Sequence, residues 1–559
     1  MLRMLTPLLS SALFCLPASA EDWTRFRGPS GSGVSADSKI PVTWSANANL
    51  KWKTEMPGPG ASSPIVVGDK VFITCYSGYG LDRNEPGEIE NLVRHLVCVS
   101  LTSGKKLWQK DLKAALPEDP YTGIGVTAHG YASHTPVTDG KNVYVFYGKG
   151  GVHAYTLDGE KLWDINVGKE SDPAKWGSSS SPVVYKNIVI VTASAESQSV
   201  VGIDKTTGKE LWRQEAKGLD NMWGTPTLVK VDDSRTDLVM CVAKEIWGMN
   251  PETGKLRWFA NATGATNSYA SLVVDGKRAF AVTGRGGGSV AVEVGGQGDV
   301  SESNTVWEGR DNASFASPVL HNSRLYSVAS KILKVIDAKT GKLVKQFRLK
   351  GARSSSRTRA LDYPSPIVAG NHLYYLDGLG NMYVFDVSGE PKQVALNKVT
   401  SDAEAFWGTP AISQGNLIMR SSKYLYCVAD KGEKVETDKE LLSKADEGSS
   451  TPPAGGRGGG GNRFDPNTMF NGMDQNKDGK ITFGELEGNR MAARLKTLDK
   501  DGDEAISKTE FTTGITSLFS RGGGGSRGGG GSRGGRGGNG YGQGAAKPDR
   551  PQRPKMEGK

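Results

Sequence analysis

Cysteine is scarce in this chain of 559 residues, which has five, at positions 15, 75, 98, 241 and 427. No two are adjacent and no C-x-x-C-H motif occurs, which excludes a c-type haem attachment site. Four scattered cysteines beyond the N-terminal segment cannot form a disulfide framework either. We expect buried thiols, with Cys75 and Cys98 as the one candidate bridge, because both fall on neighbouring predicted strands.

Long apolar runs are missing as well, and no segment beyond the first 20 residues approaches the roughly 20 apolar residues of a membrane-spanning helix. Residues 1–20 instead carry Arg3, an apolar run from 8 to 16, and Ala18-Ser19-Ala20. This pattern predicts a secretory signal peptide. We therefore expect an exported bacterial protein, whether periplasmic, secreted or at the cell surface.

A general excess of one charge is absent too, since the formal net charge of +9 is local. Residues 521–559 hold nine Lys or Arg against Asp549 and Glu557, and glycine is concentrated in residues 448–461 and 522–544. These compositions indicate a linker and a tail without a core. We expect the tail to be a solvated segment or a tether to an anionic cell surface. We do not expect it to bind nucleic acid.

A repeat covers most of the chain between these segments. A short strand that opens with Ser-Pro or Thr-Pro, followed by a polar turn and a second apolar strand, recurs seven times, and a degenerate copy at Ala270-Ser271 fills the one gap. The copies begin at residues 63, 135, 181, 225, 270, 317, 365 and 409. After a first interval of 72 residues the spacing is 44 to 48, the length of one four-stranded propeller blade.

Several copies continue with the turn Asp-x-x-Thr-Gly-Lys and a strand that carries Trp, as in Asp204 to Trp212. The glycine supplies the positive φ of the turn, and the indole ring at a fixed place packs adjacent sheets. The eighth copy has only three strands, whereas residues 50–53 form an orphan strand before the first. Pairing the two closes the ring, and this predicts an all-β, eight-bladed β-propeller of four-stranded blades.

These repeats, together with the opening Trp23-x-x-Phe-Arg-Gly-Pro, resemble the pyrroloquinoline-quinone (PQQ)-type repeat of exported planctomycete-type propellers. The resemblance covers residues 21–430. Proteins with this repeat include quinone-dependent alcohol and sugar dehydrogenases and a non-catalytic scaffold that helps insert outer-membrane barrels. The dehydrogenase alternative requires a calcium-bound quinone, an Asp base and, in several members, adjacent cysteines, and no segment here matches these residues. We expect no catalytic residues.

One face of the predicted ring gathers candidate binding residues. The insertions 76–94 and 111–132 and the crossover 351–363 should emerge together on it, because the loop between second and third strands and the crossover to the next blade share a face. The candidate ligand-face residues are His129, His134, Trp176, Trp223, Arg353, Arg357, Arg359 and Trp407. In the alternative interpretation the Trp-Gly pairs only separate blades and the arginines are solvated. His129, His134 and Asp119 also form an unspecific candidate for a metal site.

Two twelve-residue loops near the C-terminus fit the calcium-binding EF-hand pattern, in which a hard cation takes oxygen ligands. The first offers Asp474, Asn476, Asp478, Lys480 (through its carbonyl), Thr482 and Glu485, with Gly479 at the turn. The second offers Asp499, Asp501, Asp503, Ala505 (through its carbonyl), Ser507 and Glu510, but has Glu504 where the turn glycine belongs. A side chain at positive φ costs on the order of 1 kcal/mol, so we expect weaker binding there.

The predicted organisation is a signal peptide (1–20), a propeller (21–430), a linker (431–463), an α-helical EF-hand pair (464–519) and a basic tail (520–559). We expect an exported calcium-binding protein whose propeller is a binding scaffold at the cell envelope. Its partner would be an envelope or extracellular protein or a surface polysaccharide. The alternative is a PQQ-dependent oxidoreductase acting on alcohols or sugars.

Overall fold

The computed structural model describes residues 21–520 and 551–558, apart from gaps within the first range. The gaps are residues 123–125, 127–128, 174, 263, 265–266, 285–286, 312–314, 352–362, 436–441, 443–469, 471–472, 475, 477 and 487–491. The chain forms two compact units, which we call the propeller unit (Met1–Ser450 with Lys547–Lys559) and the small unit (Thr451–Ala546). The predicted signal peptide, most of the linker and most of the tail lie outside the described residues.

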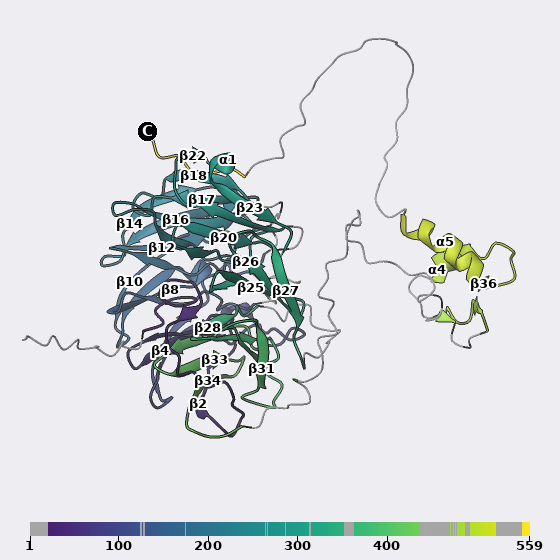
Figure 1. The fold of residues 1–559 in the computed structure, drawn as a ribbon, viewed down its shortest axis with the longest axis horizontal. Helices are drawn as coiled ribbons and strands as arrows, with labels where there is room; N and C mark the ends of the chain where they lie inside the picture. Colours follow the sequence, from purple (N-terminus) through teal and green to yellow (C-terminus); the bar gives the residue numbers. More distant parts are fainter. Residues whose placement is uncertain are drawn as a thin grey trace, which may run out of the picture. The chain divides into compact units, whose positions relative to one another are not determined.

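Eight sheets of four blade strands each make up the propeller unit (Figure 1). Blades 1 to 4 consist of β3(Ile65–Val67), β4(Lys70–Ser77), β5(Val93–Ser100), β6(Lys106–Lys113); β7(Val137–Thr138), β8(Asn142–Phe146), β9(Val152–Thr156), β10(Lys161–Ile165); β11(Val183–Tyr185), β12(Ile188–Ala193), β13(Ser199–Asp204), β14(Glu210–Glu215); and β15(Thr227–Lys230), β16(Thr236–Val242), β17(Glu245–Met249), β18(Leu256–Asn261). Blades 5 to 8 consist of β19(Val273–Asp275), β20(Arg278–Val282), β21(Ser289–Glu293), β23(Thr305–Gly309); β24(Val319–His321), β25(Arg324–Ala329), β26(Ile332–Asp337), β27(Leu343–Arg348); β28(Ile367–Ala369), β29(His372–Leu376), β30(Met382–Asp386), β31(Lys392–Asn397); and β32(Ala411–Ser413), β33(Asn416–Arg420), β34(Tyr424–Ala429), β2(Leu50–Glu55). Short elements between them are β1(Val34–Ser35), η1(Ile89–Asn91), η3(Gly148–Gly150), η4(Lys217–Leu219), β22(Gly298–Asp299) and α1(Ser301–Asn304).

The ring closes as the sequence predicts. Strand β2 pairs antiparallel with β34, with Trp52 opposite Cys427 and Glu55 opposite Tyr424. Blade 8 thus takes its outer strand from the N-terminal side of the chain and its other three strands from the end of the repeats. The predicted all-β, eight-bladed architecture is confirmed.

Neighbouring blades are locked by the tryptophan of one and the turn glycine of the next. A Cβ atom at Gly104 would lie 2.7 Å from the Trp52 ring, so only glycine fits beneath the indole. The indole Nε1 then donates to a carbonyl of the same next blade, as from Trp52 to Leu101 at 2.8 Å. The same donation joins Trp108 to Leu157, Trp163 to Lys205 and Trp307 to Ala338. The Thr-Gly turn and the Trp are therefore two halves of one contact between blades.

The segment before β2 crosses one end of the ring. Trp23 exchanges backbone hydrogen bonds with Val66 of blade 1, and the Thr24 carbonyl accepts the N–H of Thr138 in blade 2. On the opposite side β1 runs parallel to β28 of blade 7, and the buried Arg27 donates to the Pro318 carbonyl of blade 6. Residues 23–35 therefore span the end of the channel, a role that no periodicity in the sequence indicates.

The first two insertions pack together, as predicted. The Tyr76 and Tyr79 rings from the first lie 5.5 and 5.8 Å from the Tyr131 ring of the second. Most of the third insertion, with Arg353, Arg357 and Arg359, lies outside the described residues. All four described cysteines are buried and free. Cys75 and Cys98 form no bridge because they pair with His95 and Phe72, at different positions along the β4–β5 ladder.

The small unit is built around a two-stranded sheet. Strand β35(Lys480–Thr482) pairs antiparallel with β36(Ala505–Ser507), and Ile481 lies opposite Ile506. With α4(Ala492–Leu495), η5(Lys496–Leu498) and α5(Lys508–Ser520), the sheet encloses a core. The buried core residues are Phe470, Ile481, Leu486, Leu495, Leu498, Ile506, Phe511 and Ile515. Of the described helices, none is long and apolar enough to cross a bilayer.

Candidate functional site

A ring of hydroxyl groups surrounds the channel where the innermost strands begin. In each case the backbone N–H of the repeat's Ser or Thr donates to the hydroxyl oxygen of the equivalent residue one blade on. The seven bonds run from Ser63 to Thr135, Thr135 to Ser181, Ser181 to Thr225, Thr225 to Ser271, Ser271 to Ser317, Ser317 to Ser365 and Ser365 to Thr409, at 2.8 to 3.0 Å. The repeated Ser or Thr of the sequence therefore joins successive blades, and the degenerate copy keeps it in Ser271.

An arc of aromatic side chains lies beside this ring. In blades 4 to 8 the residue two positions before the repeated Ser or Thr is aromatic. These residues are Trp223, Tyr269, Phe315, Tyr363 and Trp407, and all are half-buried. The rings of Trp223, Tyr269 and Phe315 follow one another with centroids 5.0 and 4.9 Å apart, and Tyr363 lies 4.9 Å beyond Phe315. We call these five residues, together with Trp176, the aromatic arc.

Hydroxyl ring and aromatic arc line one pocket at the mouth of the channel. Phe26, from the segment that crosses the opposite end, also lines it. The predicted face residues Trp176, Trp223, Trp407 and His129 meet in this pocket. Sequence inspection missed Tyr269, Phe315 and Tyr363. Their constant offset from the repeated Ser or Thr was the signal that could have identified them.

His129 is held by the protein itself. Its Nδ1 lies 2.5 Å from the Ser133 hydroxyl, and its Nε2 lies 2.6 Å from the Trp176 carbonyl oxygen. Burial lowers the pKa of His129, so the ring is neutral at pH 7. Both nitrogens are engaged, and the side chain positions Trp176.

His134, the other predicted face residue on this insertion, belongs to a buried polar cluster between blades 2 and 3. Its Nε2 lies 3.0 Å from the Ser178 hydroxyl, which donates to the Glu196 carboxylate at 2.7 Å. Burial lowers the pKa of His134 to about 3. Asp119 pairs instead with Lys149 at 3.2 Å. The side chains proposed for a metal site are thus taken up by protein partners.

Glu196 in this cluster gives the propeller a pH dependence. Burial raises its pKa from 4.5 to about 7, against the opposing effect of the Ser178 hydrogen bond. Because the folded state then binds the proton more tightly than the unfolded chain, the wild-type free energy of unfolding should fall relative to Glu196→Gln as pH rises from 4.5 through 7. We expect a change in this difference on the order of 2 kcal/mol, measured by urea unfolding at several pH values. The exposed Glu160→Gln is the control, and a pH-independent difference for Glu196→Gln would contradict the assignment.

In the first acidic loop, the first and last of the predicted ligand residues accept hydrogen bonds from the loop backbone. The Asp474 carboxylate accepts the backbone N–H groups of Asp478 and Gly479 at 3.2 and 3.0 Å. The Glu485 carboxylate, eleven residues later, accepts those of Asn476 and Thr482 at 3.2 and 2.8 Å. The first and last carboxylates of the loop therefore fold onto its backbone.

The second loop repeats this arrangement. The Asp499 carboxylate accepts the N–H groups of Gly502 and Glu504, and the Glu510 carboxylate accepts those of Lys500 and Ser507. Single ligand oxygens of Asp499, Asp501 and Asp503 lie within 4.8 Å of one another, the one such acidic group in the described part of the chain. Glu504 has a φ of 62°, against 87° for Gly479 at the equivalent position, so the expected positive φ at Glu504 is confirmed.

Comparison with known proteins concerns the repeats. Residues 94–347 match the family model PQQ_2, described as outer membrane protein assembly factor BamB. No curated protein sequence matches the chain. The solved structure of BamB from Moraxella catarrhalis is 10% identical with a TM-score of 0.48, and the match covers 69% of this chain and 99% of that chain. A quinohemoprotein alcohol dehydrogenase from Pseudomonas putida HK5 is 11% identical with a TM-score of 0.47, covering 74% and 81%.

At such identities the two solved structures carry no information on activity. The family model and the blade geometry bear on the repeats alone. The Ser or Thr ring, the Trp and Gly contacts and the matched range all fall on the same repeats. The match to the BamB family model therefore lies within the repeats of a closed ring of eight blades.

Proposed function

We propose that the propeller is a non-catalytic platform that binds a neutral ligand at the mouth of its channel, specifically a neutral saccharide. The aromatic arc is the observation that carries this proposal. Half-buried rings in five successive blades offer flat apolar faces, and the adjacent hydroxyl ring offers hydrogen-bonding groups. A sugar presents the complementary surface, with an apolar face of C–H groups and an edge of hydroxyls.

The charge of the pocket supports a neutral ligand. The described lining consists of aromatic residues, Ser, Thr, Ala and His129, with no carboxylate and no Lys or Arg. His129 is neutral for the reason given above. An anionic or cationic ligand would lose its hydration without gaining a charged partner among these residues.

The quinone-dependent alternative fits these residues poorly. Calcium held against a quinone needs oxygen ligands of the carboxylate or amide type, and the reaction needs a carboxylate base. The described lining offers stacking surfaces but neither of these groups. The described lining therefore supports no reaction step through a quinone.

Binding of neutral saccharides to the full chain by isothermal titration calorimetry tests the proposal. Trp223→Ala and Tyr269→Ala should each weaken binding roughly tenfold, because each removes one stacking surface. Tyr185→Ala, a half-buried aromatic outside the pocket, is the matched control. Failure of all neutral saccharides to bind would contradict the proposal. If the wild-type chain bound a protein partner and Trp223→Ala abolished that binding, the ligand of the pocket would be a peptide and not a saccharide.

We further propose that the small unit is a calcium-binding EF-hand pair and that the protein is exported to the cell envelope. The donor set supports the first part, since each loop offers side-chain oxygens at alternate positions and ends in a Glu. The segment 1–20 and the family description, which names an outer-membrane assembly factor, support the second. Bound calcium would neutralise acidic side chains that otherwise repel one another.

A further inference from the structure

The last described residues, Pro551–Gly558, lie along the outer edge of blade 4. The Leu256 N–H donates to the Lys555 carbonyl at 2.9 Å, and the Glu557 N–H donates to the Leu256 carbonyl at 2.7 Å. Met556 thereby forms a parallel bridge with Leu256, and the C-terminal end lies beside β18 and β22 (Figure 1). This differs from the tail without packing that the sequence predicted, because main-chain pairing to a sheet edge needs no apolar pattern.

The N-terminal half of the segment is anchored by an arginine. Arg553 donates from Nε and Nη2 to the Glu245 carboxylate at 2.8 and 2.5 Å. Glu245 is only 1% exposed, and Trp247 Nε1 donates to it as well. The Arg553 guanidinium also lies 3.4 Å above the centroid of the Phe259 ring. A buried carboxylate beside an aromatic face is a recognition pocket for arginine, whose planar group can pair and stack at once.

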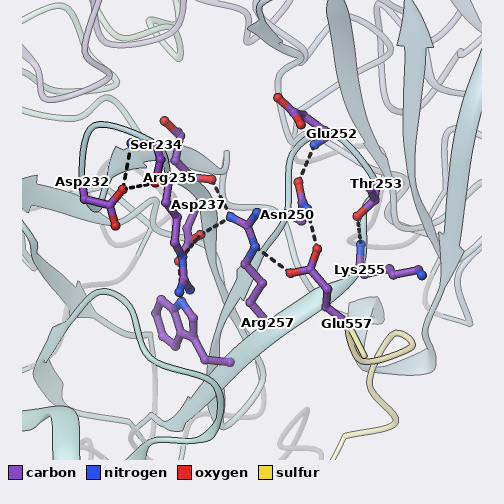
Figure 2. A network of polar contacts seen from close by, with 12 residues as sticks. Asp232, Ser234, Arg235, Asp237, Asn250, Glu252, Thr253, Lys255, Arg257 and Glu557 are labelled. Carbon is purple, nitrogen blue, oxygen red and sulfur yellow. Dashed lines mark hydrogen bonds and ion pairs between the residues drawn. The ribbon is translucent and has the colours of Figure 1, made fainter. Parts of the chain in front are cut away.

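The C-terminal half is anchored by a glutamate. Glu557 accepts hydrogen bonds from Arg257 Nε at 2.8 Å and Asn250 Nδ2 at 2.6 Å (Figure 2). Burial alone would raise the pKa of Glu557, but these hydrogen bonds lower it overall. Arg257 is in turn fixed by the fully buried carboxylate of Asp237 at 2.6 Å. The basic end of this edge, formed by Arg257 and Asn250, is therefore held in place by the blade itself.

We propose that the outer edge of blade 4 is a peptide-binding site that recognises an extended segment of the pattern Arg-x-x-x-Glu, and that the chain's own C-terminal segment occupies it reversibly. The acidic pocket and the basic end hold residues of the segment that are four positions apart, Arg553 and Glu557. Backbone pairing at Leu256 sets the register between them. In the part of the chain that the structure describes, β18 is the one outer blade strand with further pairing on its outer edge, by β22 and by Met556.

Reversible docking changes how the small unit is tethered. With the segment bound, the chain contacts the propeller unit both before the small unit, at Leu442, and after it, at residues 552–557. With the segment released, the small unit is attached through one connection only. A partner protein carrying an Arg-x-x-x-Glu segment would release it by competition.

The test compares the full wild-type chain with the full chain carrying Arg553→Ala and Glu557→Ala, whose own segment cannot dock. The probe is a fluorescein-labelled peptide of residues 547–559, followed by fluorescence anisotropy. The substituted chain should bind it with a Kd on the order of 10 µM. The wild-type chain should bind roughly a hundredfold more weakly, because its tethered segment competes at a local concentration near millimolar.

A peptide with the same two substitutions should bind neither chain, and this control leaves the receptor unchanged. Adding Glu245→Gln to the substituted chain should also abolish binding, with circular dichroism melts to verify folding. Equal affinity of the peptide for both chains, or no binding at millimolar peptide, would overturn the proposal. A wild-type dimer that dissociates when both substitutions are made would also overturn the proposal, because the segment would then bind the blade 4 edge of a second copy.

Discussion

Deletion of residues 21–55 is expected to abolish the cooperative unfolding transition of the propeller unit. The deletion removes β2, the outer strand of blade 8, and the segment that spans the channel end. It leaves the edge of β34 and the blade 1 face beneath Trp52 uncovered, and closed rings owe their solubility to having such surfaces paired. Urea unfolding followed by circular dichroism measures the effect.

A single substitution probes the same closure without a deletion. Trp52→Ala should lower the free energy of unfolding by about 3 kcal/mol, because it empties the space over Gly104 and removes the hydrogen bond to Leu101. Leu107→Ala, which removes an exposed apolar side chain from β6, should cost much less. If Trp52→Ala and Leu107→Ala shifted the urea midpoint equally, the interblade lock would not be the source of stability.

Exchange of the two turn residues between the acidic loops is expected to exchange their calcium affinities. Glu504→Gly should strengthen the second loop roughly fivefold, because it removes about 1 kcal/mol of strain at positive φ. Gly479→Glu should weaken the first loop by a similar factor. A Cβ atom at Gly479 meets nothing within 4 Å, so the cost there is that of the backbone alone. Calorimetric titration of the full chain with calcium measures both.

Glu485→Gln changes a ligand of the first loop, whereas the two turn substitutions leave the ligands unchanged. It should weaken the first loop at least tenfold, since one charged oxygen of the bidentate ligand becomes an amide. The melting transition of the propeller should stay unchanged by calcium in every variant. Absence of calcium uptake at millimolar concentration would exclude the EF-hand interpretation of the small unit.

The architecture could be predicted because it depends on contacts that repeat. The Ser or Thr ring and the pairing of Trp with a turn glycine each recur about every 46 residues, so their spacing reveals the blades and even the missing strand of the eighth. Four of the eight predicted face residues could likewise be placed at the channel mouth from loop position alone. The periodicity of the sequence reveals these positions because every blade packs against its neighbours through the same contacts.

Contacts that occur only once in the structure could not be predicted, because they produce no repeated pattern in the sequence. The segment 23–35 joins blades 1, 2, 6 and 7 through individual backbone bonds, and nothing in its composition distinguishes it from an ordinary loop. The C-terminal segment depends on Glu245, 308 residues before Arg553. The sequence around a charged residue within a repeat does not indicate a partner so far away in the chain.

The crossing of the ring by residues 23–35 and its closure by β2 also set the order in which the protein can be assembled. These residues are synthesised well before their partners in blades 6 to 8, which are made more than 280 residues later. The propeller can therefore be completed only once residue 429 has been synthesised. Until then β2 waits as an unpaired strand, and its exposed positions are Lys51, Lys53 and Glu55. Such charges discourage a waiting strand from pairing with another chain.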